Sequence, residues 1–468
     1  MSRRSIATTF ALAGTVLASA GAWWALRAGE PRRGNRTSIV LVTLDTTRAD
    51  HLSAYGYSRR TTPSLSALAA RGVRFESAIV SAPNTPVSHA SILTGAHPYR
   101  HGLRLLHGGD SGDLSRATPT LAEVLAGDGY ATAAFVSAFP AGSYFGLDRG
   151  FAHFDETFGG SGNPIAPDGT VNTGDAQRRG DETVEATLAW LAAARDDEPF
   201  FLWVHLFDPH DPYLRPPDDE ALVYAGKVPS EPDGPRRDRF LIDLYDAEIL
   251  FMDRQIGRLI SAAREDALVA VVGDHGEGLG DHGWWTHGNL YQEQIRVPMI
   301  LAGPGVPPGR VFSPTVRTVD LAPTLLDLAG VPEELRPPPA DGVSLARALG
   351  GGDPGELPAA YSEVKGRAIY HPLWLRHREP EKRGEGFALV EGGWKFIHRT
   401  TEDRFELYDL SADPAESADL AGEKPDRVAA FVRRLAGLGA YGEEAAERGE
   451  IPPDVLKKLQ SLGYGGSR

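Results

Sequence analysis

The sequence predicts an α/β protein with a large, mostly parallel sheet flanked by helices and a small antiparallel subdomain near the carboxyl end. Three apolar, β-rich runs predict the large sheet, at residues 38–44, 199–206 and 267–273. Continuous apolar runs of this kind are typical of parallel strands that are buried on both faces. Two later runs, at residues 389–397 and 405–410, indicate antiparallel strands and therefore predict the smaller sheet.

Helices and polar excursions connect these runs. Residues 118–125 predict a helix before a short strand at 131–136, and residues 240–260 have the apolar spacing of a helix that covers one face of the sheet. Two segments, 159–180 and 212–237, are rich in Pro, Gly and charge and are too long for simple connections. The second segment is either a lid that selects the substrate or a solvated surface loop.

The domain organisation follows from these patterns. A chain of 468 residues with 41% hydrophobic content can bury a sizeable core, and large sheets stay within a single domain. We expect residues 38–350 to form a large catalytic domain and residues 351–468 to form the small subdomain with a helical tail. Residues 30–37 are expected to be a linker, and residues 1–29 a signal peptide or a single membrane anchor.

The amino-terminal stretch predicts export. Arg3 and Arg4 precede a mainly apolar stretch at residues 6–26, whose length is just sufficient to cross a hydrocarbon core of ~30 Å. Ala18-Ser19-Ala20 offers a small-residue cleavage site, so a cleaved signal and a membrane anchor remain alternatives, beside a soluble flexible start. We expect a periplasmic, extracellular or membrane-anchored location outside the cytoplasm, with membrane contact through residues 6–26.

Composition excludes some partners and some chemistry. The 48 basic and 63 acidic residues give a formal charge of −15, which repels polyanions and argues against nucleic acid as a partner. The chain contains no cysteine, so it has neither disulfides nor a thiol nucleophile. Any catalytic nucleophile therefore comes from another type of side chain.

Residues 84–95 place one hydroxyl group where a helix should begin. Pro86 fits the first helical position, so we expect Thr85 to be the N-cap and Gly95 to end the helix. The free N–H groups and the dipole of a helix start bind anions and favour an alkoxide over an alcohol. His89 lies four residues on, one turn away on the same face. Thr85 is therefore a candidate nucleophile, provided that other segments supply a cation and acid–base groups.

Polar residues follow all three apolar runs of the large sheet. Asp45 ends the first run, His210 follows the second, and Asp274 and His275 end the third. In open α/β sheets, functional groups collect beyond the carboxyl ends of the strands. We therefore expect these side chains, which come from distant parts of the sequence, to meet in one crevice.

Five segments of the chain occur in the order of one known family. They are Leu44-Asp45-Thr46-Thr47-Arg48-Ala49-Asp50, Ser88-His89-Ala90-Ser91-Ile92-Leu93-Thr94-Gly95, Gly273-Asp274-His275-Gly276-Glu277, Arg296-Val297-Pro298, and the pair Lys395-Phe396-Ile397 and Glu406-Leu407-Tyr408-Asp409-Leu410-Ser411-Ala412-Asp413-Pro414. Together they resemble the sulfatase family of the alkaline-phosphatase superfamily, from about Ile39 to the carboxyl terminus. The resemblance implies an alkaline-phosphatase-like sheet and, for the last pair, that family's small C-terminal subdomain.

Two departures from the family pattern bear on the chemistry. Sulfatases carry Cys or Ser, which is oxidised to formylglycine, at the position of Thr85, and Arg at the position of His89. Thr cannot become formylglycine, and Thr85-Pro86-Val87-Ser88-His89 resembles instead the Thr-centred motif of nucleotide pyrophosphatases and phosphodiesterases. Residues 132–139 also lack the Lys-x-His pair that sulfatases usually keep after the nucleophile helix. The resemblance therefore favours a phosphate monoester or diester over a sulfate ester.

The resemblance implies a metal-dependent nucleophilic mechanism. Four residues would bind one divalent ion, Mn²⁺, Zn²⁺, Ca²⁺ or Mg²⁺, in an oxygen-rich site with one nitrogen ligand: Asp45, Thr85, Asp274 and His275. Coordination lowers the pKa of the Thr85 hydroxyl, which then attacks in line and forms a covalent phospho-threonine that water hydrolyses.

Histidines are the candidate acid–base groups, because imidazoles titrate near neutral pH. By alignment with the family, His210 and His287 are the candidates to protonate the leaving group, and His89 is the neighbour of the nucleophile. Asp208, His210 and His282 form an alternative, second metal cluster, but we expect a single metal ion.

Three functions remain open. The first is an exported, metal-dependent phosphate mono- or diesterase acting on a small molecule or on a lipid- or glycan-linked ester, with a sulfate ester hydrolase that works without formylglycine as its close alternative. The second is a phosphoethanolamine or phosphoglycerol transferase, although such proteins usually carry several membrane spans. The third is a non-enzymatic binding protein, against which the joint retention of Asp45, Thr85, Asp274 and His275 argues.

Overall fold

The computed structural model describes most of the chain in eight stretches. These are residues 36–104, 114–158, 176–195, 197–213, 216–217, 235–336, 341–365 and 385–438. The predicted signal or anchor at residues 6–26, most of the two polar excursions and the tail after residue 438 lie outside the described residues. Among the helices that are described, none combines the length and the apolar character needed to cross a membrane.

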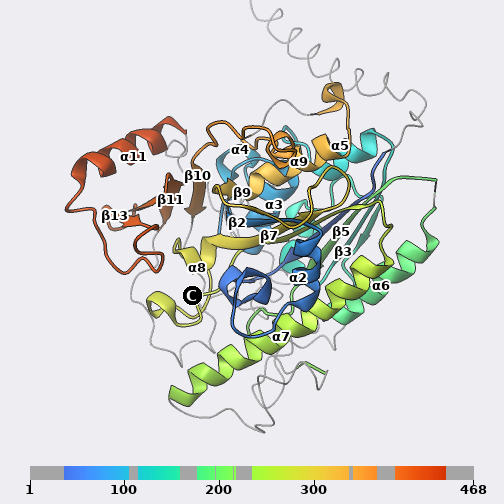
Figure 1. Ribbon diagram of the computed structural model, residues 1–468, viewed down its shortest axis with the longest axis horizontal. Coiled ribbons are helices and arrows are strands. Elements are labelled where there is room, and N and C mark those ends of the chain that lie inside the picture. Colours follow the sequence, from blue (N-terminus) through green and yellow to red (C-terminus); the bar gives the residue numbers. More distant parts are fainter. Residues whose placement is uncertain are drawn as a thin grey trace, which may run out of the picture.

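A nine-stranded sheet forms the centre of the larger domain (Figure 1). Its order is β4-β3-β5-β1-β6-β7-β2-β8, with β9 paired to β2. The pairs from β4 to β6 are parallel, and β7 runs antiparallel to both of its neighbours. The predicted mostly parallel sheet is thus confirmed. The strands are β1 Ile39–Leu44, β2 Gly72–Ile79, β3 Ala131–Val136, β4 His153–Asp155, β5 Phe200–Leu206, β6 Leu268–Gly273, β7 Arg296–Ala302, β8 Arg310–Phe312 and β9 Val316–Arg317.

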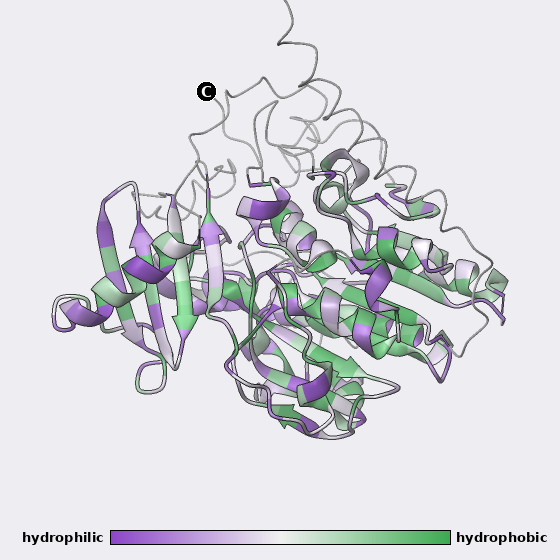
Figure 2. Cartoon of the chain, turned by 90° about the horizontal axis from the view of Figure 1, so that it is seen from above, coloured by the Kyte–Doolittle hydropathy of each residue, from purple (hydrophilic) through white to green (hydrophobic). Residues whose placement is uncertain are grey.

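Strand β1 shows why the predicted strands have no polar face. All six of its residues are buried. Ile39 and Leu41 pack into the hydrophobic core on one face of the sheet, and Val40 and Val42 pack into the core on the other face. Because successive side chains of a strand point to opposite faces, a strand covered on both sides reads as a continuous apolar run. In Figure 2 the hydrophobic colour is accordingly concentrated on the strands of the large sheet.

Helices cover both faces of this sheet. One face is covered by α2 Pro63–Ala70, α6 Gly180–Ala193 and α7 Pro235–Ala262, and the other by α3 Thr85–Thr94, α5 Leu121–Gly127 and α9 Leu321–Leu328. Short α-helices lie at α4 Pro98–His101, α8 Gln292–Ile295 and α10 Ala346–Leu349. Single turns of 3-10 helix lie at Ala49–His51, Ser53–Tyr55, Phe139–Ala141, Ser143–Phe145, Asp281–Gly283, Thr318–Asp320 and Glu333–Leu335.

The start of α3 differs by one residue from the prediction. Asn84, not Thr85, is the N-cap: its backbone is extended, and its side chain accepts a hydrogen bond from the Val87 N–H at 3.2 Å. Thr85 is therefore the first residue of the helix, and the predicted cap was wrong because Asn competes strongly for that role. The predicted end is confirmed, since Gly95 ends the helix in the left-handed conformation with φ +66°.

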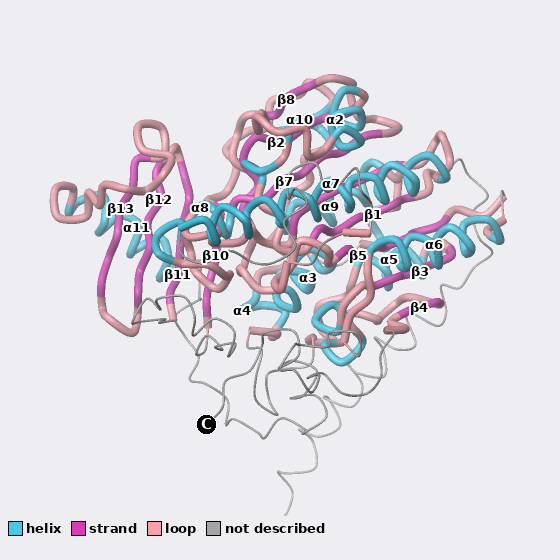
Figure 3. Tube along the Cα trace, turned by 90° about the horizontal axis from the view of Figure 1, so that it is seen from below, coloured by secondary structure: helices cyan, strands magenta, loops and turns pink. Residues whose placement is uncertain are grey.

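A second, four-stranded antiparallel sheet forms the smaller unit, which stands beside the large domain (Figure 3). Its strands are β10 Ala360–Val364, β11 Gly386–Glu391, β12 Trp394–Arg399 and β13 Arg404–Asp409, and α11 Pro425–Gly437 packs against it. The run predicted at residues 389–397 is a hairpin of two strands. Gly392 and Gly393 make its turn with positive φ angles of 57° and 78°.

Candidate active site

The register of three central strands brings the candidate ligands together. Leu44 at the end of β1 pairs with Leu206 of β5 on one side and with Gly273 of β6 on the other. The backbone continues the pairing beyond the strands, because the Asp45 N–H donates to the Leu206 carbonyl at 2.9 Å and the Asp274 N–H donates to the Leu44 carbonyl at 3.1 Å. Both carboxylates therefore emerge at the same edge of the sheet, as predicted for parallel strands.

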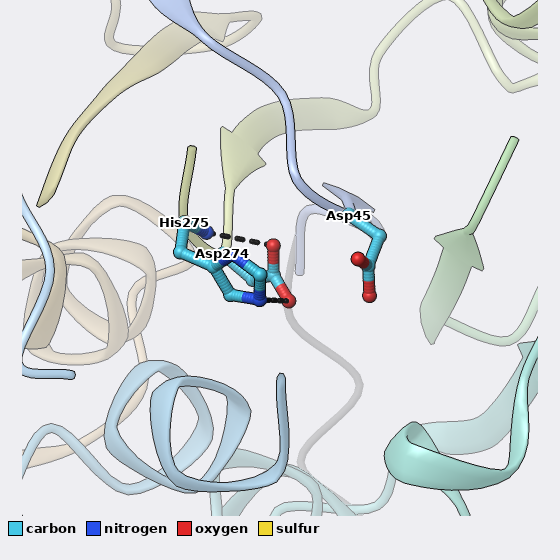
Figure 4. Close-up of side chains that lie close together, drawn as sticks. All are labelled: Asp45, Asp274 and His275. Atoms are coloured by element: carbon cyan, nitrogen blue, oxygen red, sulfur yellow. Dashed lines mark hydrogen bonds and ion pairs between the residues drawn. The ribbon is translucent and has the colours of Figure 1, made fainter. Parts of the chain in front are cut away.

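Asp45, Asp274 and His275 form one compact, fully buried group (Figure 4). Each offers one ligand atom, and these atoms all lie within 4.8 Å of one another. Within the part of the chain that the structure describes, this is the one group of at least three acidic or histidine ligands with such spacing.

Thr85 lies directly against this group. Its Oγ1 donates to Asp45 Oδ2 at 3.2 Å and lies 3.3 Å from His275 Nε2. The first turn of α3 thus presents a hydroxyl to two of the three ligand residues, and the residue is fully buried. The four residues predicted as a metal site are therefore neighbours in the structure.

The hydrogen bonds of His275 assign its tautomer. Nδ1 lies 3.0 Å from the Gly276 carbonyl, and a carbonyl can only accept, so Nδ1 carries the proton. Nε2 of the neutral ring therefore has a lone pair directed toward Thr85. Burial lowers the pKa of His275 well below its usual range, and the neighbouring His287 lowers it further. The ring is thus held neutral, which is the form that binds metal ions.

The two carboxylates lie in surroundings that suit a cation. Burial raises the pKa of Asp45 and of Asp274 well above the usual range, and the charge of Asp45 raises that of Asp274 further. Among the described residues, Asp45 Oδ1 and Asp274 Oδ2 have no hydrogen-bond partner. Buried anionic oxygens without donors are costly, and a divalent ion satisfies both at once. This donor set of carboxylate, hydroxyl and imidazole atoms fits the expected metal.

The turn after Asp45 is strained. Thr46 has φ +45°, a left-handed conformation that a β-branched residue rarely adopts. Three hydrogen bonds hold it there: its N–H donates to Asp274 Oδ1 at 3.2 Å, its hydroxyl donates to the Pro209 carbonyl at 2.9 Å, and its carbonyl accepts from the Tyr245 hydroxyl at 2.7 Å. The strain turns the chain at the site and ties together the ends of β1, β5 and β6.

His210 and His287 lie beside the ligand group. The His287 ring is 4.4 Å from the His275 ring and 5.3 Å from the His210 ring, measured between centroids. His210 donates from Nδ1 to the Asp211 carbonyl at 2.6 Å and stacks on Phe207. Three imidazoles, one from the segment after β5 and two from the segment after β6, thus converge, which places the predicted acid–base groups next to the ligand group.

His89 occupies a different position, in the wall behind Thr85. Its Nδ1 donates to the Thr85 carbonyl at 2.7 Å, and its Nε2 accepts from the Thr43 hydroxyl at 2.9 Å. Burial lowers its pKa well below the usual range. With both nitrogens bound to the protein, His89 is placed to hold the first turn of α3 rather than to meet a substrate.

The alternative second cluster does not assemble among the described residues. Asp208 accepts a hydrogen bond from the Gly180 N–H at 2.9 Å. His282 stacks on Tyr291 and pairs with Glu293 at 3.0 Å. No ligand group in the described stretches contains Asp208, His210 and His282 together.

The sequence analysis missed His205, which lies inside the apolar run of β5. It is fully buried, and its Nε2 lies 3.2 Å from Asp45 Oδ2. Glu277, quoted only as part of a motif, is also buried, with Oε1 3.6 Å from His287 Nδ1. The sequence did hold a signal for His205: it is a histidine near the end of an apolar, buried strand, and a buried polar group needs a hydrogen-bond partner.

Comparison with solved structures bears first on the fold. In the solved phosphonate monoester hydrolase of Agrobacterium radiobacter, 100% of the chain superimposes on 89% of this one, with a TM-score of 0.65 and 21% identity. A structure solved in complex with its substrate D-glucosamine-2-N,6-O-disulfate gives a TM-score of 0.67 at 20% identity, over 86% of this chain and 98% of the other. This chain therefore shares its fold with both of these proteins.

This chain belongs to the Sulfatase family, whose profile matches residues 37–331, and with that family to the alkaline-phosphatase superfamily. The profile described as N-sulphoglucosamine sulphohydrolase, C-terminal, matches residues 280–435. A choline-sulfatase from Rhizobium meliloti (strain 1021) is 28% identical over 420 residues, covering 77% of each chain. The chain is thus a sulfatase-family hydrolase that acts on sulfate or phosphate ester bonds, and enzymes of this family typically use a divalent metal.

Proposed function

We propose that this enzyme hydrolyses phosphate monoesters or diesters, with Thr85 as the nucleophile. The observation that carries the proposal is the position of Thr85 Oγ1, 3.2 Å from Asp45 Oδ2 and 3.3 Å from His275 Nε2, at the first turn of α3. A carboxylate and a neutral imidazole are both able to accept the hydroxyl proton. The site is thus arranged to turn an ordinary hydroxyl into a nucleophile.

The metal requirement of the proposal rests on the same residues. A divalent ion held by Asp45, Thr85, Asp274 and His275 would supply Lewis-acid stabilisation and lower the pKa of the Thr85 hydroxyl. The helix start adds a positive potential and free N–H groups for the oxygens of a phosphoryl group.

The reaction then proceeds in two displacements. Thr85 Oγ1 gives its proton to Asp45 Oδ2 and forms a bond to phosphorus while the bond from phosphorus to the leaving oxygen breaks, and that oxygen takes a proton from His210 or His287. Water next attacks the phospho-threonine, the bond between phosphorus and Oγ1 breaks, and Oγ1 takes its proton back from Asp45, which regenerates the hydroxyl. The histidine that has given its proton to the leaving group, His210 or His287, is then the base that activates the water.

Hydrolysis of a sulfate ester is the second candidate function. The 28% identical choline-sulfatase favours it, and sulfate and phosphate groups share size and tetrahedral shape. The residue type at position 85 favours the phosphate ester instead, because Thr lacks the chemistry that makes formylglycine. The natural substrate is in either case a small-molecule, lipid-linked or glycan-linked ester, and we propose that the enzyme meets it after export.

The test uses the purified chain from Pro31 onward with three aryl substrates: a phosphate monoester, a phosphate diester and a sulfate ester. Thr85→Ala should lower turnover of the phosphate esters by at least about 10³-fold, because it removes the nucleophile. Thr94→Ala is the matched control, since Thr94 lies at the far end of the same helix, where its hydroxyl donates to the Ala90 carbonyl and accepts from the Ala96 N–H. Acid quenching during turnover should leave a phosphoryl group on the peptide that contains Thr85.

Two further results decide between the candidates. Chelation should abolish turnover, and addition of a single divalent ion should restore it, with the bound metal counted by elemental analysis. Undiminished turnover in Thr85→Ala would show that the nucleophile is another group. Preferred turnover of the aryl sulfate by the unmodified protein would establish the second candidate in place of the first.

A further inference from the structure

The segment that carries His287 is held firmly on its amino-terminal side. Residues 278–286 form a tight turn in which the Gly278 N–H donates to the Thr286 carbonyl at 2.9 Å. The Arg48 guanidinium, itself buried, donates to the carbonyls of Glu277 and Gly278 at 3.3 and 3.1 Å. The large domain thus fixes the chain up to Thr286, one residue before the imidazole.

The chain has no such support immediately after His287. Gly288 has φ +102°, and a Cβ placed there would meet nothing within 4 Å. Glycine in open space lets the backbone pivot, so the anchoring of the next residue helps to set the position of the imidazole. That residue is Asn289. Its N–H donates to Gln294 Oε1 at 2.6 Å, and its Oδ1 accepts from the Leu290 N–H at 2.8 Å.

The small subdomain supplies a further anchor for Asn289. Arg399, on β12, donates from Nη1 to Asn289 Oδ1 at 2.8 Å. Its side chain is 11% exposed, and its Nε donates to Glu406 Oε1 at 2.7 Å. Glu406 Oε2 in turn accepts from the Tyr291 hydroxyl at 3.0 Å. The guanidinium is therefore locked by a buried carboxylate and directed at the far side of the Gly288 pivot.

We propose that Arg399 is a positioning residue for His287, so that the small subdomain completes the active site. This inference rests on the proposed function, in which His287 is a proton donor to the leaving group. Arg399 does not touch the reacting atoms; it acts through Asn289. The junction where it acts lies around α8, between the two sheets (Figure 1).

The proposal makes a selective prediction. Without the hydrogen bond from Arg399, Asn289 keeps its bonds to Gln294 and Leu290 but loses the contact that ties its side chain to the small subdomain. The His287 ring then shifts from its place against His275, while Asp45, Thr85 and Asp274 keep theirs. Proton transfer to the leaving oxygen is then lost, but metal binding is not. The loss should therefore appear in kcat for esters with poor leaving groups and disappear for esters whose leaving group needs no proton.

The test compares Arg399→Met with Arg404→Met. Arg404 is the matched control, because it also donates to Glu406 Oε1, at 2.6 Å, but half of its side chain is exposed and it pairs with Glu402 and Glu406. On a series of aryl phosphates, Arg399→Met should lose about 10-fold in kcat on the poorest leaving groups and almost nothing on the best. KM and metal content should stay at the values of the unmodified enzyme. Arg399→Lys, which keeps one donor, should recover part of the loss.

His287→Gln separates this inference from the proposed function. If His287→Gln shows the leaving-group dependence and Arg399→Met does not, the positioning role is overturned and the proposed function stands. If His287→Gln shows no such dependence, its role as proton donor is wrong, and the positioning role falls with it. In the double variant, Arg399→Met should add little to His287→Gln; an additive loss would overturn the inference. Should Arg399→Met fail to fold, Asn289→Ala removes the same hydrogen bond from the other side.

Discussion

Asp45 is the residue on which the contacts of the site converge. Its Oδ2 accepts from Thr85 Oγ1 and lies 3.2 Å from His205 Nε2, and its backbone follows the paired ends of β1 and β5. The buried His205 has no role in the chemistry of the proposed reaction, but it fixes the direction in which the carboxylate points. Such partners of a ligand usually matter for metal affinity as well as for activity.

His205→Gln should therefore weaken metal binding by roughly 10–100-fold, because Asp45 loses the imidazole that orients it. Competition with a chromophoric chelator measures the affinity directly. His101→Gln is the control, since His101 is equally buried but its ring nitrogens contact Ser91 and the Leu103 N–H. Equal affinities in the two variants would contradict the orienting role.

Asp208 links one buried side chain to the stability of the whole protein. Burial raises the pKa of Asp208 from 3.8 to about 6, although its Oδ1 accepts from the Gly180 N–H. Between these values the folded protein holds a proton that the unfolded chain has lost. The stabilisation from this group is thus complete below the ordinary pKa and is lost as the pH rises through about 6.

Asp208→Asn should remove this dependence. The free energy of unfolding of the unmodified protein should fall by about 3 kcal/mol relative to Asp208→Asn between pH 4 and pH 7, which corresponds to the two-unit shift. Urea unfolding at several pH values measures the difference. Asp266→Asn changes an exposed carboxylate beside Arg264, and the free energy of unfolding of this variant should vary with pH as it does in the unmodified protein. A constant difference for Asp208→Asn would show that the carboxyl titrates alike in both states.

At the scale of the element, α3 carries the nucleophile at its first residue and depends on its cap. At the start of the helix, the Asn84 side chain accepts a hydrogen bond from the Val87 N–H. At the end of the helix, the 3-10 turn at Thr318–Asp320 packs closely: the Val319 carbonyl would lie 3.2 Å from a Cβ placed on Gly95. The helix is buried along its whole length. A helix that is fixed at both ends and buried throughout keeps Thr85 in place without further support.

Asn84→Ala should lower the free energy of unfolding by about 1 kcal/mol, because it leaves the Val87 N–H without its acceptor. Asn84→Ser should restore most of this loss, since a Ser side chain also caps a helix. Thermal or urea unfolding of the two variants checks the prediction. If both variants lost the same amount, the size of the side chain and not the cap would be responsible.

At the scale of the whole molecule, a buried ion pair of the small subdomain lies against the large domain. Lys395 and Glu416 are both fully buried and lie 2.6 Å apart. Glu416 Oε2 also accepts from the Gln292 N–H at 2.6 Å, at the start of α8. Burial lowers the pKa of Lys395 and raises that of Glu416, so each charge depends on the other.

Removal of either charge alone should therefore be costly. Lys395→Met is expected to lower the free energy of unfolding by about 3–5 kcal/mol, because it leaves Glu416 charged and unpaired in the interior. The double variant Lys395→Met, Glu416→Gln should lose clearly less than the sum of the single variants. Arg434→Met, which breaks the exposed pair with Glu391, should cost less than about 1 kcal/mol. If the loss in the double variant equalled the sum of the losses in the two single variants, Lys395 and Glu416 would not depend on each other.

The sequence by itself determined the local and periodic features of this protein. The apolar runs at residues 38–44, 199–206 and 267–273 predicted three parallel strands, and the glycine at position 95 predicted the end of α3, because burial on two faces and left-handed backbone leave direct marks in residue type. The motifs around Asp45, Thr85 and Asp274 identified the family for the same reason, since their residue types are dictated by chemistry.

The tertiary structure alone decided which side chains meet. The register of β5, β1 and β6 brings His205 against Asp45, the first turn of α3 turns His89 into the wall behind Thr85, and the subdomain brings Arg399 to Asn289. The contacts of His205 with Asp45, of His89 with Thr43 and of Arg399 with Asn289 have no local signature, because each joins residues more than forty positions apart in the chain. Long-range packing, rather than residue type, decides which histidines face the nucleophile and which support it.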